Sequence, residues 1–170
     1  MIMIHTDTLP NRKIWEMLLI LFMALIFLVN GCQTSPEKKK LNHYNKGVEY
    51  LQKGEIQSAI LELKNSLEID AKFADAHYQL GLAYLNLREY DKAMIAFGNA
   101  ASNDPANIDA RLQVANYYYT QQQDYTKAQE ELEKILHDYP NNAEVYAALG
   151  SVYYSQEKKE EAIAALQKSL

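Results

Sequence analysis

The chain has 170 residues, with 17 Lys+Arg against 22 Asp+Glu, a formal net charge of −5 and 48% apolar residues. That apolar fraction is ordinary for a globular protein and too high for a disordered one. The single cysteine excludes an intramolecular disulfide framework and a cysteine-based metal cage. The acidic balance argues against a nucleic-acid partner. The length suits one domain or one short repeat array.

The N-terminal segment has the pattern of an export signal. Arg12 and Lys13 precede 13 uninterrupted apolar residues at 17–29 (MLLILFMALIFLV). A helix of that length rises about 20 Å, which is shorter than a bilayer core of about 30 Å. A positive region, a short apolar region and small residues after it are typical of a signal peptide. An uncleaved signal anchor with an incidental cysteine is the alternative.

The apolar run ends in Val29-Asn30-Gly31-Cys32, which resembles the lipobox of bacterial lipoproteins. The resemblance implies that 1–31 is a cleaved signal peptide and that the Cys32 thiol receives diacylglycerol. It also implies that 32–39 is an acylated cysteine with a short polar tether. Palmitate or similar chains would anchor the protein, because each buried CH₂ adds about 0.8 kcal/mol. Gln33, where inner-membrane lipoproteins of enteric-type bacteria carry Asp, implies a place in the bacterial cell envelope on the outer membrane, facing the periplasm.

The remainder of the chain contains an internal repeat of 34 residues. The repeats are 40–73, 74–107, 108–142 and 143–170; the third has one extra residue near 121–124, and the fourth is partial. Four positions recur in each repeat: a small residue (Gly47, Gly81, Ala115, Gly150), a tyrosine (Tyr50, Tyr84, Tyr118, Tyr153), an alanine (Ala59, Ala93, Ala128, Ala162) and a large apolar residue (Leu63, Phe97, Leu132, Leu166).

This pattern resembles the tetratricopeptide repeat (TPR), which the second repeat (ADAHYQLGLAYLNLREYDKAMIAFGNAASNDPAN) matches almost throughout. The resemblance implies an all-α fold, a right-handed superhelical solenoid of antiparallel helix pairs. The small residue on the first helix lets the second helix approach closely. Pro105 and Pro140 end the second and third repeats, since proline cannot continue a helix. One pair cannot bury its apolar face alone, so the pairs must stack.

Several positions depart from the family pattern. Lys46 replaces a leucine, as expected of an N-terminal capping helix that faces water. The extra residue of the third repeat is predicted to lengthen the turn inside that pair. The sequence stops at Leu170 without the polar helix that usually ends such arrays, which predicts a truncated chain or a last pair covered by another molecule. The slot that usually holds an aromatic ring contains His43, His77, Arg111 and Tyr146, and its histidines are interpreted as replacements for a packing ring.

No catalytic constellation is present. The sequence has no glycine-rich phosphate loop, no nucleophile elbow and no metalloprotease motif. Equivalent positions of stacked helices are about 8–10 Å apart, too far for His43 and His77 to share a metal ion at bond lengths of about 2 Å. Acidic runs such as Glu130-Glu131 lie one turn from lysines and indicate a solvated helix face. We therefore expect no enzyme activity, no cofactor and no metal.

Function is then expected to be surface recognition of a protein or peptide. The TPR resemblance implies that the first helices line a concave groove with the second, fifth, sixth, ninth, twelfth and thirteenth residues of each repeat. Tyrosines would supply contact area, and Asn or Gln would pair with peptide amides, although some of these residues could simply pack between helices. The groove lacks the Lys/Arg cluster that clamps a C-terminal carboxylate in chaperone-binding relatives. The predicted groove residues are Tyr44, Asn45, Val48, Tyr78, Gln79, Leu82, Leu85, Leu112, Gln113, Asn116, Tyr119 and Tyr154.

Three functions are compatible with this pattern. The first is a lipid-anchored envelope scaffold or adaptor, similar to the TPR lipoproteins of type IV pilus assembly or of exopolysaccharide export. The second is a regulatory adaptor subunit of an inner-membrane polysaccharide or peptidoglycan synthase complex, against which Gln33 argues. The third is the N-terminal part of a longer protein, in which the repeats serve a missing catalytic domain.

Overall fold

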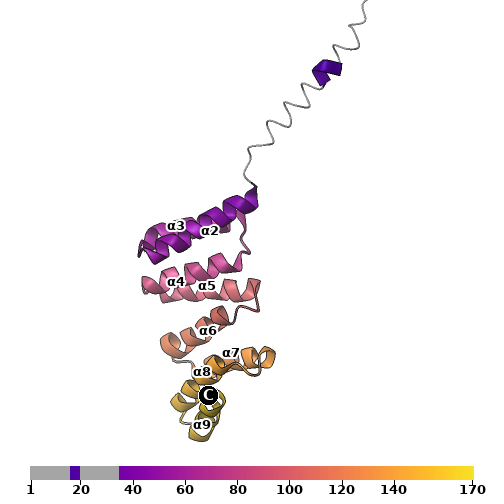
Figure 1. Cartoon of the computed structure of the whole chain (residues 1–170). Helices are drawn as coiled ribbons and strands as arrows, with labels where there is room; N and C mark the ends of the chain where they lie inside the picture. The colour runs from indigo at the N-terminus through magenta and orange to yellow at the C-terminus, as the bar shows by residue number, and fades with distance from the viewer. Residues whose placement is uncertain (1–15, 20–34) are drawn as a thin grey trace, which may run out of the picture. The chain divides into compact units, whose positions relative to one another are not determined.

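The structure is a computed structural model that describes residues 16–19 and 35–170 (Figure 1). The chain divides into two units, Met1–Ser35 and Pro36–Leu170. In the first unit, residues 16–19 are helical. Cys32 and most of the predicted signal peptide lie outside the described residues. Within the described part of the chain, no helix combines the length and the apolar character needed to cross a membrane.

The second unit is a stack of antiparallel helix pairs without a strand in residues 35–170. The second helix of each pair contacts the first helix of the next, so the pairs follow one another in chain order (Figure 1). The predicted all-α solenoid of helix pairs is confirmed. The pairs are α2 (Pro36–Gln52) with α3 (Ile56–Ile69), α4 (Ala74–Asn86) with α5 (Tyr90–Asn103), α6 (Ile108–Tyr117) and its π-helical continuation η1 (Tyr118–Gln122) with α7 (Tyr125–Asp138), and α8 (Ala143–Ser155) with α9 (Lys159–Lys168).

Glycine on the first helix allows close contact within a pair. A Cβ atom on Gly47 would lie 2.7 Å from Cγ of Leu63, and one on Gly81 would lie 2.6 Å from Cε1 of Phe97. Carbon atoms in favourable contact are about 3.5–4.0 Å apart. The large apolar residue of the second helix therefore occupies the space that a side chain on the glycine would need.

Each pair is closed by a turn with one left-handed residue at the same repeat position. In the first two pairs the next N–H donates to a tyrosine carbonyl five residues back, from Glu55 to Tyr50 and from Glu89 to Tyr84, both at 2.9 Å. This bond closes the C-terminus of the first helix. Only glycine adopts such a conformation without a steric cost of about 1 kcal/mol. The left-handed residues are Gly54 (φ 75°), Arg88 (φ 58°), Gln123 (φ 52°) and Glu157 (φ 63°).

The extra residue of the third repeat lies in the helix, so the prediction of a longer turn is wrong. The closing bond from the Asp124 N–H to the Tyr118 carbonyl, 2.9 Å long, spans six residues instead of five. A π-helix, η1, occupies this segment. Its wider turn takes in one additional residue without breaking the chain of backbone hydrogen bonds. Only Gln123 and Asp124 then separate η1 from α7.

The first helix begins earlier than the sequence predicted. We expected a polar tether over 32–39, but α2 starts at Pro36. Proline at the first helical position and Glu37 in the first turn both favour a helix start. Lys40 then holds α2 in place, because its ammonium lies 3.1 Å from the Asp70 carboxylate and 4.6 Å from the centre of the Phe73 ring.

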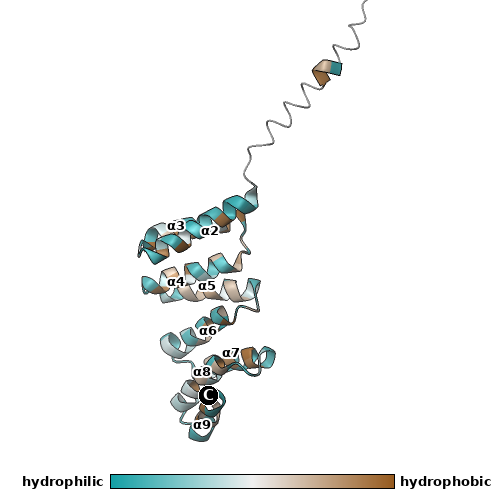
Figure 2. Cartoon of the chain, in the orientation of Figure 1, coloured by the Kyte–Doolittle hydropathy of each residue, from teal (hydrophilic) through white to brown (hydrophobic). Residues whose placement is uncertain are grey.

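Two apolar clusters form the core. The first lies among α3, α4 and α5 and includes Leu63 and Phe97. The second lies among α6, α7 and α8 and includes Leu132, Ile135 and Val145. Each of these five side chains is at most 2% exposed. Hydrophilic residues prevail on α2, while α4 and α5 carry more apolar ones (Figure 2), as expected where the stack begins on a helix with a neighbour on only one side.

Candidate binding groove

A pocket of about 250 Å³ opens between α6 and α8, and we call it the α6–α8 pocket. Its floor is apolar and its other lining groups are amides, hydroxyls and one carboxylate. Pockets that bind ligands or peptide side chains have this composition, with apolar area for affinity and a few polar groups for orientation. The lining residues are Leu112, Gln113, Ala115, Asn116, Tyr119, Leu132, Glu144, Ala148, Ser151 and Val152. Four predicted groove residues, Leu112, Gln113, Asn116 and Tyr119, therefore meet here.

The π-helix η1 supplies the aromatic wall of this pocket. Tyr119 lies within η1, and its ring centre is 5.7 Å from that of Tyr125 at the start of α7. Its hydroxyl lies 3.1 Å from the hydroxyl of Ser155 on α8. The ring is therefore fixed on one side by packing and at its tip by a hydrogen bond. Such an aromatic residue provides contact area at little entropic cost.

A second, smaller pocket of about 60 Å³ adjoins the first along the same face. Leu85 of α4 lines it, together with Gln113 and Asn116, which also line the α6–α8 pocket. The two amide side chains thus lie between the pockets. The rest of the smaller pocket is lined by α5, α6 and η1, including Tyr90 and Phe97.

Other predicted groove residues are partly packed against the core. Tyr44 lies 5.0 Å from Phe73 and Tyr78 lies 5.6 Å from Phe97, measured between ring centres. Leu82 also packs against the first apolar cluster. These side chains are half-buried, so they contribute to stability as well as to the surface. Among the remaining predicted residues, Val48 and Gln79 are half-buried, whereas Asn45 and Tyr154 are exposed.

The sequence reasoning named no acidic residue in the groove, but the structure places one there. Glu144 lines the α6–α8 pocket. It is the second residue of its repeat, and the same position holds Asp75 and Asp109 in the two preceding repeats. All three carboxylates are exposed, and none forms an ion pair within residues 35–170. The second position was among those predicted to face the groove, so reading it across the repeats would have found this row.

The electrostatic influence of the row reaches neighbouring tyrosines. Burial raises the pKa of the Tyr44 hydroxyl, and the carboxylate of Asp75 raises it further. Burial also raises the pKa of Tyr78, with added contributions from Asp109 and Glu144. One tyrosine of the second repeat thus interacts with acidic groups of the third and the fourth. Both contributions disfavour the ionised form of these two tyrosines.

The comparisons with known proteins identify the family. The family model described as the cytochrome c-type biogenesis protein H TPR domain matches residues 33–170. The chain belongs to this TPR family. No match was found among curated proteins.

Solved structures place the TPR chain among known helix-pair solenoids. A crystal structure of MamA is 26% identical with a TM-score of 0.68, and the match covers 77% of this chain and 71% of MamA. MamA from Desulfovibrio magneticus RS-1 is 27% identical with a TM-score of 0.67, covering 77% of this chain and 73% of that one. PilF from Pseudomonas aeruginosa is 27% identical with a TM-score of 0.68, covering 81% of this chain and 62% of PilF.

At the repeat position that usually holds an aromatic ring (the slot), three of the four residues bond to the loop before their helix, which is the joint between two TPR pairs. The interpretation of its histidines as packing rings is incomplete, because His77 Nε2 lies 2.9 Å from the Ala71 carbonyl, six residues earlier. Arg111 and Tyr146 likewise donate to carbonyls six residues earlier. His43 instead contacts Glu62 at 2.6 Å. Within the described residues, no three His, Cys, Asp or Glu side chains are grouped so that they could hold a metal ion.

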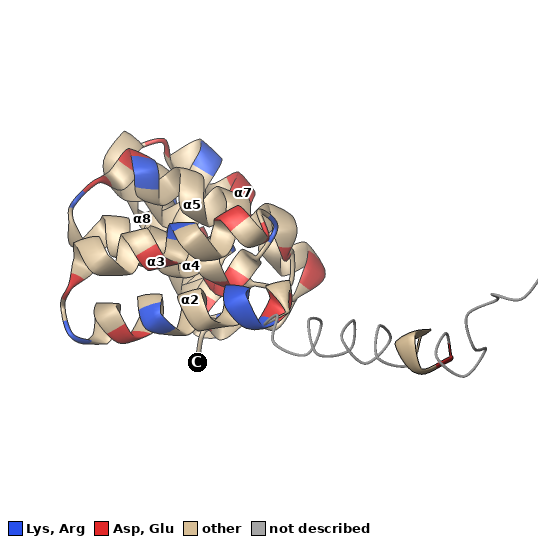
Figure 3. Ribbon diagram, turned by 90° about the horizontal axis from the view of Figure 1, so that it is seen from above, with Lys and Arg blue, Asp and Glu red and all other residues tan. Residues whose placement is uncertain are grey.

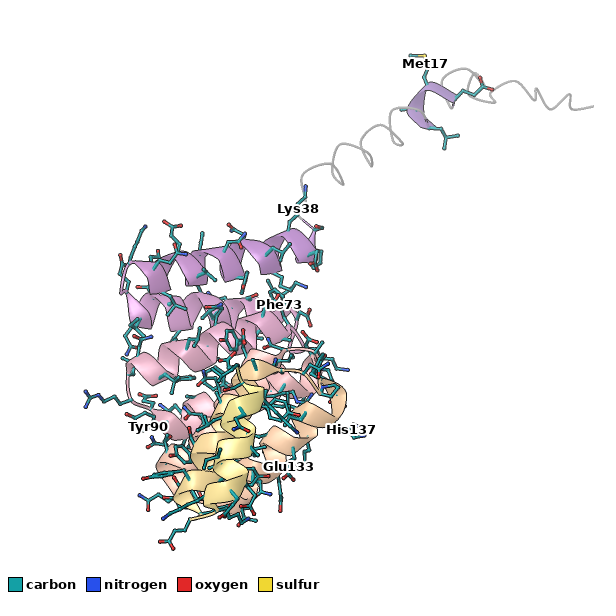
Figure 4. All side chains as sticks on the ribbon, turned by 60° about the horizontal axis from the view of Figure 1, so that its bottom comes forward. Met17, Lys38, Phe73, Tyr90, Glu133 and His137 are labelled. Atoms are coloured by element: carbon teal, nitrogen blue, oxygen red, sulfur yellow. The ribbon has the colours of Figure 1, made fainter. Side chains whose placement is uncertain are left out.

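Some of the charged residues outside the groove form ion pairs one helical turn apart. Lys134 lies 2.8 Å from Glu131, and Lys92 lies 2.6 Å from Glu89. Acidic and basic residues are interspersed over the helices (Figure 3), and His137 projects from the outer edge of α7 (Figure 4). This is the solvated helix surface expected from the sequence. Asp75, Asp109 and Glu144 of the groove form no ion pair within residues 35–170, and the same is true of Glu160 and Glu161 outside it.

Proposed function

We propose that this TPR protein is a lipid-anchored scaffold of the bacterial envelope that holds a protein partner in its first-helix groove. The observation that carries this proposal is the α6–α8 pocket, with its apolar floor and its rim of Gln113, Asn116 and Tyr119. Amide side chains pair with both groups of a peptide backbone, and the apolar floor accepts a side chain. The resemblance to pilus-assembly and exopolysaccharide-export lipoproteins suggests that the partner belongs to a pilus or a secretion or export complex.

Membrane attachment is the second part of the proposal. Acylation of Cys32 would tether the repeats to the membrane, and Gln33 favours the outer membrane, with the groove in the periplasm. The variant Cys32→Ser should accumulate as a larger precursor and take up no labelled palmitate. A mutant that is still labelled and processed would refute the lipobox assignment without affecting the groove.

The groove is tested by site-specific photo-crosslinking in the native host. A photoreactive phenylalanine derivative replaces Tyr119, since it retains an aromatic ring at the pocket wall. The matched control places the same group at Ile95, which is 63% exposed on α5 and lines neither pocket. A protein captured from position 119 and not from position 95 supports the groove as the binding site. Equal capture from both positions, or none from 119, overturns it.

The family match favours a second candidate function, in cytochrome c biogenesis. Its supporting observation is the agreement of residues 33–170 with the TPR domain of cytochrome c-type biogenesis protein H. The partner in the groove would then be a c-type cytochrome precursor or another component of its assembly. Mass spectrometry of the protein crosslinked at position 119 discriminates this function from a role in a pilus or an export complex.

A further inference from the structure

The row of carboxylates along the groove identifies the chemistry of its occupant. This inference rests on the proposed function and deepens it. We propose that the groove binds an extended, basic segment of a partner protein, with one Lys or Arg side chain entering the α6–α8 pocket beside Glu144.

The composition of the α6–α8 pocket suits a basic side chain. Leu112, Ala148 and Val152 provide apolar area, while Glu144 supplies the only charge in the lining. Lysine and arginine combine an aliphatic stem with a terminal charge, and they bury the stem while the charge remains near water or a counter-ion. An apolar side chain would leave the carboxylate unused, and an acidic one would be repelled by it.

The same charge recurs along the path of an extended peptide. Asp75, Asp109 and Glu144 occupy equivalent positions of α4, α6 and α8. Helices in direct contact are about 8–10 Å apart, which sets a lower bound of about three residues of extended chain, at about 3.3 Å each, between successive carboxylates. Basic residues at every third position therefore form the densest pattern that could match the row. None of the predicted groove positions in the four repeats holds a lysine or arginine that could neutralise the row.

Helix stability is a competing explanation for these residues. Each carboxylate lies in the first turn of its helix, where negative charge is favourable near the positive end of the helix dipole. Glu160 and Glu161 occupy the first turn of α9 in the same way, but they lie outside the groove positions. They therefore provide a control that changes helix charge without changing the groove.

The test measures peptide binding to charge-matched variants of the full chain. The probes are two short fluorescein-labelled peptides with alanine and glutamine at most positions and either lysine or glutamate at every third. Binding is followed by fluorescence anisotropy at low and at high salt. The groove variant is D75N/D109N/E144Q and the control is E130Q/E160Q/E161Q, so each removes three negative charges. Circular dichroism confirms that both variants remain helical.

We expect the lysine peptide to bind more tightly than the glutamate peptide. The groove variant should weaken its binding roughly 10-fold, because each exposed ion pair contributes a factor of about 2 to 5, and the control should change it less than about 2-fold. A charge-conserving E144D variant should retain binding and so separates loss of charge from loss of structure. Equal weakening in both triple variants, or no preference for lysine, overturns the inference.

The crosslink from position 119 separates this inference from the proposed function. Sequencing of the crosslinked partner peptide should show lysine or arginine within about three residues of the attachment site, the closest spacing that could match the row. A specific crosslink to a segment without basic residues would leave the scaffold function standing and overturn the charge assignment. Absence of any crosslink would overturn the function itself.

Discussion

The contact between Gly81 and Phe97 allows a quantitative test of how the helix pairs pack. In the variant Gly81→Ala, the added Cβ would meet three ring atoms of Phe97 at 2.6, 2.7 and 2.8 Å. Phe97 is only 2% exposed and borders the small pocket of about 60 Å³, so any movement of the ring towards that pocket would cost it part of its packing. Overpacking of this kind costs about 1–3 kcal/mol, and the better helix propensity of alanine recovers about 1 kcal/mol. We expect a net loss of about 1 kcal/mol in the free energy of unfolding.

The third repeat supplies the compensating change. There Ala115 stands opposite Leu132, and both are 2% exposed. Replacing Phe97 with Leu in the Gly81→Ala background recreates that pair. Phe97→Leu alone should cost about 1–2 kcal/mol through lost packing. The double variant should be more stable than the sum of the two single effects predicts, by about 1 kcal/mol, because leucine can change rotamer where the flat ring cannot.

Urea unfolding followed by circular dichroism measures the four free energies. The comparison holds if the slope of free energy against urea stays constant across the variants, since a changed slope means that cooperativity has altered. Additive effects within about 0.5 kcal/mol would refute the reasoning, because residues in contact should couple and independent ones should not. In that case Gly81 would serve something other than close helix approach.

Three further predictions concern the turns, the caps and the surface charges. Arg88→Gly should raise the free energy of unfolding in urea by about 0.5–1 kcal/mol, since glycine adopts φ 58° without strain. A loss of stability would mean that the contacts of the arginine side chain contribute more than the strain costs. Asp124→Ala should cost about 1 kcal/mol in the same assay, because its carboxylate caps α7 by accepting the Lys127 N–H at 3.0 Å; an unchanged midpoint would contradict this. Bonds to neighbouring cations lower the pKa of Asp70 and of Asp138 from the usual 3.8, so the stability that these carboxylates add is present above about pH 4 and is lost as pH falls through the lowered values. The melting temperature should therefore be level near neutral pH and fall below about pH 4. A decline that begins above pH 6 would point to other groups.

The helix pairs were predictable because their signal repeats. A glycine that needs close approach and an apolar residue that fills the space recur with a constant offset, so each repeat supports the assignment of the others. The location of the inserted residue was also evident, but its conformation was not. A turn and a helix can both absorb one residue, and only the contacts of η1 favour the helix. The helical start at Pro36 was missed because 36–39 is polar, and the contacts of Lys40 that stabilise it lie far along the chain.

The groove was predicted in part. Leu112, Gln113, Asn116 and Tyr119 gather around one pocket, as their positions in the repeat implied. Tyr78 also packs on Phe97, a contact that depends on the exact approach of two helices and has no local sequence signal. The acidic row escaped notice because a single acid in a first helical turn is unremarkable. It becomes informative only when the same position is compared across repeats and when Glu144 is seen to line the α6–α8 pocket.

The bonds from each slot residue to the preceding loop have a mechanical consequence. The joint before α4 is held by an imidazole, the joint before α6 by a guanidinium and the joint before α8 by a phenol. Arg111 also donates at 2.7 Å to Asp138 at the end of α7, within its own helix pair, whereas the His77 imidazole has its other nitrogen buried without a partner. A load applied along the solenoid would therefore extend these joints unequally.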